Sequence, residues 1–130
     1  SKIRSKDTKP ELRVRGLLHW LGYRYRVHRR DLPGSPAIVF PGRAKIIFIH
    51  GCFWHAHRHC KIANTPKSRP SFWSAKFTRN SERDKLNERL LQQSGWSVCI
   101  VWECETHDKG LLTNRLYKFL GHPSSTHKIA

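Results

Sequence analysis

The sequence contains no methionine, no long apolar run and few acidic residues. Because translation begins at methionine, we expect that residues preceded Ser1. No stretch approaches the roughly 18 consecutive apolar residues of a membrane-spanning helix, and no signal-peptide pattern opens the chain. These absences favour a cytoplasmic protein over a membrane-spanning or secreted one, and in such a protein cysteines are thiols or metal ligands rather than disulfides.

Acidic side chains are scarce relative to basic ones. Nine Asp and Glu face 25 Lys and Arg, which leaves a net charge of +16 on 130 residues. A compact domain of this charge favours a polyanionic partner, and nucleic acid is the leading class. A membrane surface is a weaker candidate because no basic amphipathic helix stands alone. The length and the five Trp indicate one folded domain over residues 1–120, followed by a tail at 121–130.

Local patterns predict a helix and three strands in the N-terminal half. Thr8 is typical of a helix N-cap, and the helix is expected to end near Gly22. Its apolar stripe consists of Leu12, Leu17, Leu18 and Leu21. Alternating aromatic and basic residues predict a half-exposed strand over 23–28. Strands over 37–40 and 44–50 are expected to form a hairpin, the second of them in the middle of a sheet because it is apolar on both faces.

The C-terminal half is predicted to contain helices around one more apolar strand. Residues 71–93 have helical composition, as one helix or as two that break near Asn80. A strand follows over 96–103, and a closing helix over 110–120. That helix places three leucines on one face: Leu112, Leu116 and Leu120. The resulting element order predicts an α/β fold in which a small mixed β-sheet is flanked by helices.

Histidine and cysteine gather between residues 50 and 60. Zinc in structural sites takes four Cys or His ligands in a tetrahedron. The candidate ligands are Cys52, His57, Cys60 and Cys104. His59 is an alternative to His57 because both lie in the same short loop, and the competing interpretation is a loop of solvated histidines with buried thiols. Cys99 lies among apolar residues and is predicted to pack in the core.

Several short motifs occur together in one order along the chain. They are Leu32-Pro33-Gly34-Ser35-Pro36, the run from Phe48 to His55, Phe72-Trp73, Asn80, Arg83-Asp84, Gly95-Trp96 and the run from Val101 to Cys104. With these motifs the chain resembles the very-short-patch-repair DNA mismatch endonuclease family over residues 1–120. The resemblance implies a fold related to the type II restriction endonucleases (PD-(D/E)xK-related), with a structural zinc site.

The same resemblance implies an activity. Members of this family nick duplex DNA in a magnesium-dependent reaction, on the 5′ side of the T of a T:G mismatch that arises when 5-methylcytosine deaminates. The expected partner is therefore double-stranded DNA containing a T:G mismatch, and the expected cofactors are Mg²⁺ and Zn²⁺. Because one active site suffices to nick one strand, we expect a monomer.

The resemblance also assigns catalytic positions. Glu11 matches an acidic residue on the first helix, and Ala37 falls where the family has its metal-binding Asp. The backbone carbonyl of Ile49 matches a further metal ligand. His50 and His55 match the active-site histidines, and His55 is the one that activates water. Taken alone, Glu11 could equally close the capping box, His50 could pack at the end of its strand, and His55 could ligate zinc.

Aromatic and basic residues are expected to contact DNA. Phe53, Trp54 and Trp73 match side chains that wedge into the base stack beside the mismatch, although core packing is the alternative for any Trp. Lys76 and Asn80 match residues near the mispaired bases. Further basic residues are expected to surround the site loops and contact phosphates: Arg24, Arg26, Arg29, Arg30, Arg43, Arg58, Lys61, Lys67 and Arg69.

One feature conflicts with an active nuclease. No acidic residue lies between Asp31 and Glu82, so the two hairpin strands carry no carboxylate, and this gap coincides with Ala37. Either Asp was changed to Ala deliberately to trap uncleaved DNA, or the protein is naturally inactive or altered. Both predict impaired nicking with retained DNA binding. The alternative functions are a non-catalytic zinc-containing DNA-binding relative and a related restriction or homing nuclease that cuts matched DNA.

Overall fold

The computed structural model describes residues 8–52 and 70–123. Its elements are α1 (Lys9–Leu21), β1 (Arg26–Val27), β2 (Ile38–Phe40), η1 (Pro41–Arg43), β3 (Lys45–His50), α2 (Pro70–Gln93), β4 (Ser97–Trp102), η3 (Glu103–His107) and α3 (Lys109–Leu120). The order of helices and strands is the predicted one, with two short 3₁₀ helices added. Within the described residues, no helix is long and apolar enough to cross a membrane.

The four strands form one mixed sheet in the order β1-β2-β3-β4. The pairs β1–β2 and β2–β3 are antiparallel, whereas β3 and β4 run parallel. The predicted small mixed sheet is therefore confirmed. The central position predicted for the second hairpin strand is also confirmed, because β3 has neighbours on both sides. The parallel register places His50 opposite Trp102 at the carboxyl end of both strands.

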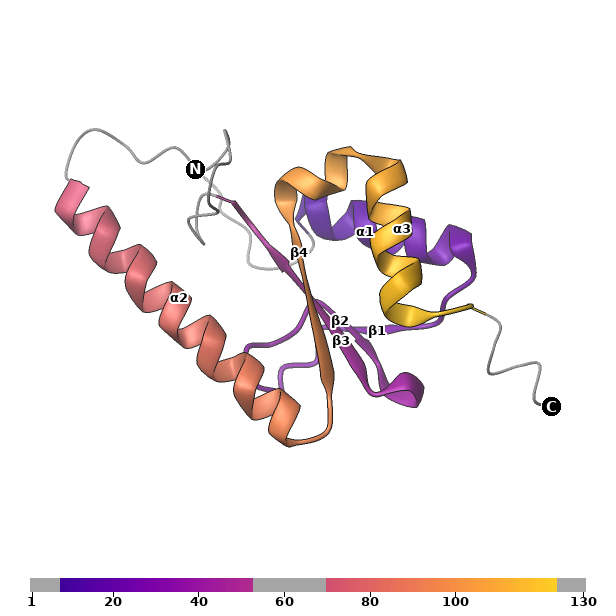
Figure 1. The fold of residues 1–130 in the computed structure, drawn as a ribbon, viewed down its shortest axis with the longest axis horizontal. Coiled ribbons are helices and arrows are strands. Elements are labelled where there is room, and N and C mark those ends of the chain that lie inside the picture. Colours follow the sequence, from indigo (N-terminus) through magenta and orange to yellow (C-terminus); the bar gives the residue numbers. More distant parts are fainter. Residues whose placement is uncertain (1–7, 53–69, 124–130) are drawn as a thin grey trace.

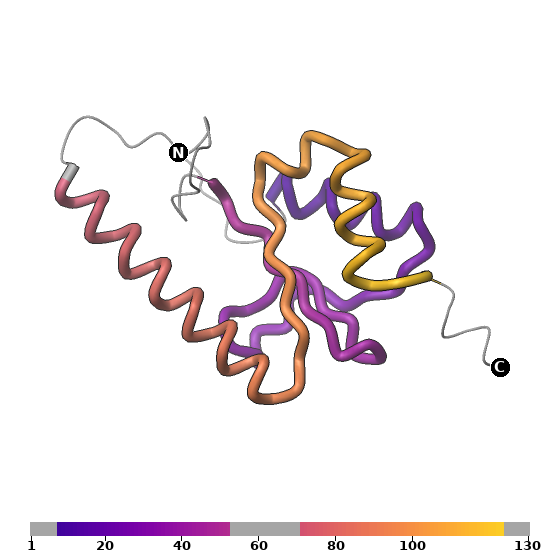
Figure 2. Tube along the Cα trace, viewed as in Figure 1, coloured from indigo at the N-terminus to yellow at the C-terminus, as the bar shows by residue number. Residues whose placement is uncertain are grey.

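Helices cover both faces of the sheet, with α1 and α3 on one side and α2 on the other (Figure 1). The larger core lies between the sheet and the pair α1 and α3, and it includes Leu18, Ile47 and Leu116. A smaller core joins the C-terminal part of α2 to the opposite face through Val39, Ile46 and Leu91. Because successive strand residues face opposite sides, the apolar run of β3 supplies both cores. Towards its N terminus α2 leaves the sheet (Figure 2).

Helix ends follow the predicted signals. The Thr8 hydroxyl accepts a hydrogen bond from the Glu11 backbone N–H at 3.4 Å, and Gly22 ends α1 with φ of 96°. The buried stripe of α1 differs from the prediction, because Val14 is buried and Leu12 is 47% exposed. Val14, Leu17 and Leu18 have i, i+3, i+4 spacing, so they lie on one face of the helix. Leu12 lies outside that face.

Two further expectations about elements were wrong in part. The strand predicted over 23–28 is reduced to β1, because only Arg26 and Val27 pair with β2. The helix α2 runs without a break through Asn80. The amide oxygen of Asn80 accepts a hydrogen bond from Arg83 Nη2 at 2.8 Å, one turn on, so this group does not compete for the helix backbone.

Candidate active-site cavity

A cavity of about 190 Å³ lies at the carboxyl end of β3, between α1, the hairpin and α2. Its lining residues are Glu11, Gly34, Ser35, Ala37, Phe48, Ile49, His50, Asp84, Asn87, Glu88 and Ile100. The hairpin produces this arrangement because β2 begins where β3 ends, as the pairing of Ile38 with Ile47 shows. Four residues predicted for catalysis or metal binding, distant in sequence, therefore share one cavity: Glu11, Ala37, Ile49 and His50.

His50 is the most enclosed polar group of this cavity. Its side chain is 7% exposed, and its ring meets Trp102 edge-on with 5.2 Å between the ring centroids. The ring centroid of Phe48 lies 6.0 Å from that of His50. His50 is thus both packed at the end of its strand and part of the cavity wall, so the two interpretations of this residue coexist.

Acidic side chains reach the cavity from helices rather than from strands. Glu11 enters from the first turn of α1, and Asp84 and Glu88 enter from α2. Three of the nine carboxylate side chains of the sequence therefore line one small cavity. The hairpin carries no carboxylate, as predicted, but the cavity beside it does.

Asp84, Asn87 and Glu88 were not predicted as site residues. Their i, i+3, i+4 spacing puts them on one face of a helix, and that spacing is the signal by which they could have been found. The same face of α2 continues towards its N terminus through Asn80 and Lys76, which are half-buried. One helix face therefore runs from the residues predicted to contact DNA to the lining of the cavity.

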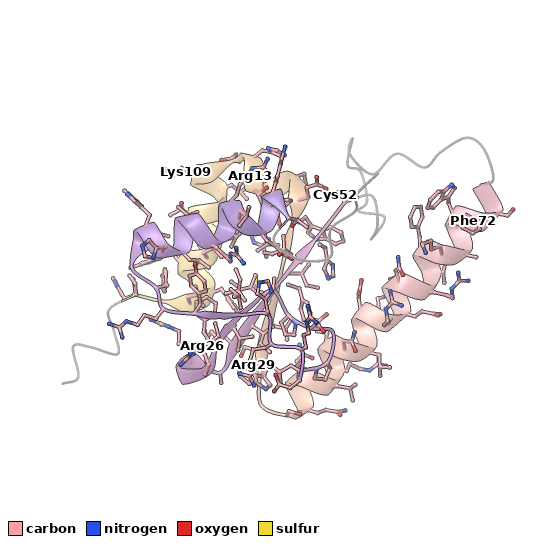
Figure 3. All side chains as sticks on the ribbon, turned by 180° about the vertical axis from the view of Figure 1, so that it is seen from behind. Arg13, Arg26, Arg29, Cys52, Phe72 and Lys109 are labelled. Carbon is pink, nitrogen blue, oxygen red and sulfur yellow. The ribbon has the colours of Figure 1, made fainter. Side chains whose placement is uncertain are left out.

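Trp73 lies near the N-terminal end of that helix face. It is half-buried, and its ring stacks on that of Phe77 with 6.0 Å between centroids and 28° between planes. Phe72 meets it edge-on at 5.1 Å. These three rings form an aromatic cluster on the part of α2 that lies away from the sheet (Figure 3). Phe53 and Trp54, the other predicted wedges, lie outside the described residues.

The cavity only partly fits the divalent cation that the resemblance implies. Carboxylates and backbone carbonyls are the ligands of hard cations, and Glu11, Asp84 and Ile49 could supply them. The position assigned to the main protein ligand does not fit, because the half-buried methyl group of Ala37 has no donor atom. His55, the predicted water-activating residue, lies outside the described residues.

Two of the predicted zinc ligands meet where β3 and β4 end. Cys52 (Figure 3) is fully buried just after β3, and Cys104 lies in η3. The Cys104 backbone N–H donates to the Cys52 sulfur at 3.3 Å, and the Cys52 N–H donates to Glu103 Oε1 at 3.2 Å. An N–H donor to sulfur stabilises a thiolate, the form that binds zinc. The donor chemistry of this pair therefore fits a zinc site.

The other members of the predicted zinc set cannot be placed. His57, His59 and Cys60 lie outside the described residues. Over residues 8–52 and 70–123, no group of three or more His, Cys, Asp or Glu side chains could hold a metal ion. Cys99 is buried in the larger core as predicted. Burial raises the pKa of its thiol, and the nearby guanidinium of Arg115 opposes this rise.

Of the nine basic residues predicted around the site loops, three line a different cavity. Arg24, Arg26 and Arg43 line a second, larger cavity that shares no residue with the first. Arg29 donates two hydrogen bonds to the carboxylate of Asp31, at 2.8 and 2.9 Å. These bonds lower the pKa of Asp31. Arg58, Lys61, Lys67 and Arg69 lie outside the described residues.

Comparison with known proteins finds one family model and several relatives named as DNA endonucleases or nicking enzymes. The family described as DNA mismatch endonuclease Vsr matches residues 1–62. The type II nicking enzyme V.XorIIP of Xanthomonas oryzae pv. oryzae is 52% identical over 119 residues, which cover 92% of this chain and 87% of that protein. V.NmeAIP, a type II nicking enzyme of Neisseria meningitidis serogroup A, is 44% identical over 92% of this chain and 84% of its own length. The DNA mismatch endonuclease Vsr of Escherichia coli K12 is 42% identical over 86% of this chain and 71% of its own length.

Proposed function

Because the chain belongs to the Vsr DNA mismatch endonuclease family, we propose that it binds duplex DNA at a T:G mismatch and is built to nick the strand 5′ to the thymine. The observation that carries this proposal is the cavity that joins Glu11, Ala37, Ile49 and His50. Relatives named as nicking enzymes and as a mismatch endonuclease support the reaction class.

The chemistry of this chain's residues supports hydrolysis of a phosphodiester. That reaction needs an activated water and stabilisation of the charge that develops on the phosphate. We assign water activation to His55, because a neutral imidazole accepts a proton near neutral pH. His50 would orient the phosphate in the cavity, and the Glu11 carboxylate would hold a water of the magnesium ion. Ala37 cannot bind the magnesium ion of the family, so this chain is expected to bind its DNA and nick it slowly.

Proposals about zinc, DNA contacts and the oligomeric state complete this function. Zinc, bound by Cys52, His57, Cys60 and Cys104, would fix the loop between β3 and α2 to the end of β4 and hold His55 in place. Phe53, Trp54 and Trp73 would wedge between base pairs, which costs least where pairing is already weak. Lys76 and Asn80 would lie near the mispaired bases, and the protein would act as a monomer.

A nicking assay tests the proposed function. The chain as it stands, Ala37→Asp and Ala37→Asn are incubated with Mg²⁺ and a labelled duplex, with and without a single T:G mismatch. We expect Ala37→Asp to nick the T-bearing strand of the mismatched duplex at least ~10²–10³-fold faster than the others, because only Asp restores a charged metal ligand.

The control variant separates charge from size. Ala37→Asn has nearly the same volume as Ala37→Asp and lacks its charge, so it should stay as slow as the parent chain. If Ala37→Asp is also inert but all three proteins bind the mismatched duplex, the chain is a non-catalytic DNA-binding relative. Equal nicking of matched and mismatched duplexes would instead contradict the assignment to mismatches.

A further inference from the structure

The larger cavity, of about 600 Å³, has a basic lining, and no acidic side chain lines it among the residues that the structure describes. It is lined by His19, Tyr23, Arg24, Tyr25, Arg26, Phe40, Pro41, Gly42, Arg43 and Pro123, and we refer to it as the arginine cavity. Three guanidinium groups therefore share one concave surface without a neutralising carboxylate. These arginines were expected to contact phosphates around the site loops, and the structure groups them in a cavity that shares no residue with the smaller one.

The two cavities lie at opposite ends of β3. The arginine cavity includes η1, which precedes the strand, whereas the smaller cavity includes His50, which ends it. The six residues of β3 span roughly 20 Å at about 3.3 Å per residue. Figure 3 shows Arg26 near the hairpin end of the sheet and Cys52 beyond the other end of β3.

Arg43 gives the arginine cavity a fixed positive charge. Its guanidinium donates to the carbonyl oxygens of Leu120, His122 and Pro123 at 2.7, 2.9 and 3.0 Å, and it lies 5.3 Å from the centre of the Tyr23 ring. Carbonyl groups hold the cation in place without cancelling its charge. Burial raises the pKa of Tyr23, and Arg43 opposes the rise, so the phenol is neutral at pH 7 and adds no negative charge.

Arg24 and Arg26 supply the groups that a ligand could contact. Both side chains are exposed, and neither makes an ion pair or hydrogen bond within the part of the chain that the structure describes. The alternation around β1 turns Tyr23 and Tyr25 inward and these two arginines outward. Arg29, by contrast, is already bound to Asp31. Guanidinium groups bind phosphate oxygens in pairs, through two parallel N–H donors.

We propose that the arginine cavity binds backbone phosphates of the same DNA duplex whose mismatch occupies the smaller cavity. This inference rests on the proposed function. A separation of roughly 20 Å corresponds to about 6 base pairs at 3.4 Å each, so the second contact falls outside the mismatch and its immediate neighbours. It contributes affinity and register without reading sequence, because phosphates carry no base information.

Salt dependence of DNA binding tests this inference. The parent chain, Arg24→Gln/Arg26→Gln and Arg79→Gln/Arg89→Gln are titrated into a fluorescent duplex of about 24 base pairs at several salt concentrations. The control pair removes the same charge from exposed positions of α2 that line neither cavity. Each lost phosphate contact lowers the slope of log K against log salt by about 0.9. We expect a decrease near 1.8 and at least ~10-fold weaker binding for the first pair, and a much smaller change for the control.

Duplex length gives a second measurement. When the duplex ends fewer than about 6 base pairs from the mismatch on one side, the parent chain should bind as weakly as Arg24→Gln/Arg26→Gln. Truncation on the other side should leave the difference between them intact. Thermal melting of both double variants at the parent's temperature would show that they are folded.

The outcomes separate this inference from the proposed function. Equal slopes for the two double variants, or a difference that survives truncation on both sides, would overturn the phosphate contact. If the first pair abolishes binding of a poly-glutamate peptide but leaves duplex binding unchanged, the arginine cavity serves an acidic protein segment, and the inference fails. A loss of mismatch preference in the parent chain would contradict only the proposed function, because the slopes can be measured on a matched duplex.

Discussion

Gly34 is the residue whose backbone most directly shapes the candidate active site. It lies in the cavity wall with φ of 78°, and a Cβ atom there would come within 3.0 Å of the Phe48 ring and 3.1 Å of the Asn87 side-chain nitrogen. Gly34→Ala is therefore expected to lower the free energy of unfolding by about 1–3 kcal/mol. Gly16→Ala is the matched control, because a Cβ atom at this helical position would have no neighbour within 4 Å. It should raise the free energy of unfolding by about 0.5–1 kcal/mol.

Urea unfolding of the two glycine variants checks this prediction. The midpoints should move in opposite directions while the slopes stay equal. A Gly34→Ala protein as stable as the parent would show that the loop before β2 can shift to accommodate the added Cβ atom. In that case the cavity would not depend on Gly34.

At the scale of single residues, the candidate site could be predicted only where its residues lie in recognisable sequence motifs. Glu11, Ala37 and His50 were identified from motifs, and the structure brings them together. Asp84 and Glu88 were missed because a carboxylate on a basic helix resembles a solvated surface charge until the packing of α2 is known. That Arg24 lines the other cavity could not be predicted either, since neighbourhood in the sequence does not show which end of a sheet a side chain reaches.

At the scale of elements, the junction of β3 and η3 is where we expect zinc to act. Cys52→Ala and Cys104→Ala should each reduce zinc from about one per chain to well below one, since a structural site needs all four ligands. Cys99→Ala is the control, because this thiol is buried in the larger core. It should keep its zinc while losing some stability. Elemental analysis of protein purified without chelator measures the zinc content per chain. A parent chain with far less than one zinc would contradict the proposed zinc site.

Helix and strand positions followed from sequence patterns, but their pairing did not. The caps at Thr8 and Gly22, and the leucine face of α3, are local signals, and each is present in the structure. The parallel pairing of β3 with β4 joins residues separated by the whole of α2, and no local pattern encodes such a contact. Asn80 shows the opposite kind of error, in which a local signal predicted a break that is absent. Its low helix propensity is outweighed because the helix face that it shares packs towards the cavity.

At the scale of the whole molecule, charge is unevenly distributed along β3. The smaller cavity contains Glu11, Asp84 and Glu88, whereas the described lining of the arginine cavity at the other end contains three arginines and no carboxylate. A DNA duplex is attracted by the arginine end and repelled by the acidic end until a bound cation neutralises the carboxylates. Long-range attraction thus selects an orientation before short-range contacts form.

The same charge should destabilise the free protein. A net charge of +16 creates repulsion within a compact chain, and salt screens it, because the Debye length falls from about 30 Å at 0.01 M to about 8 Å at 0.15 M. The melting temperature of the free chain should therefore rise by several degrees over this range, since about 1 kcal/mol corresponds to roughly 4 °C for a domain of this size. The chain saturated with duplex DNA is the control, because its melting temperature should fall over the same range as salt weakens the complex. A melting temperature of the free chain that stays constant or falls with salt would show that repulsion within the chain does not limit its stability.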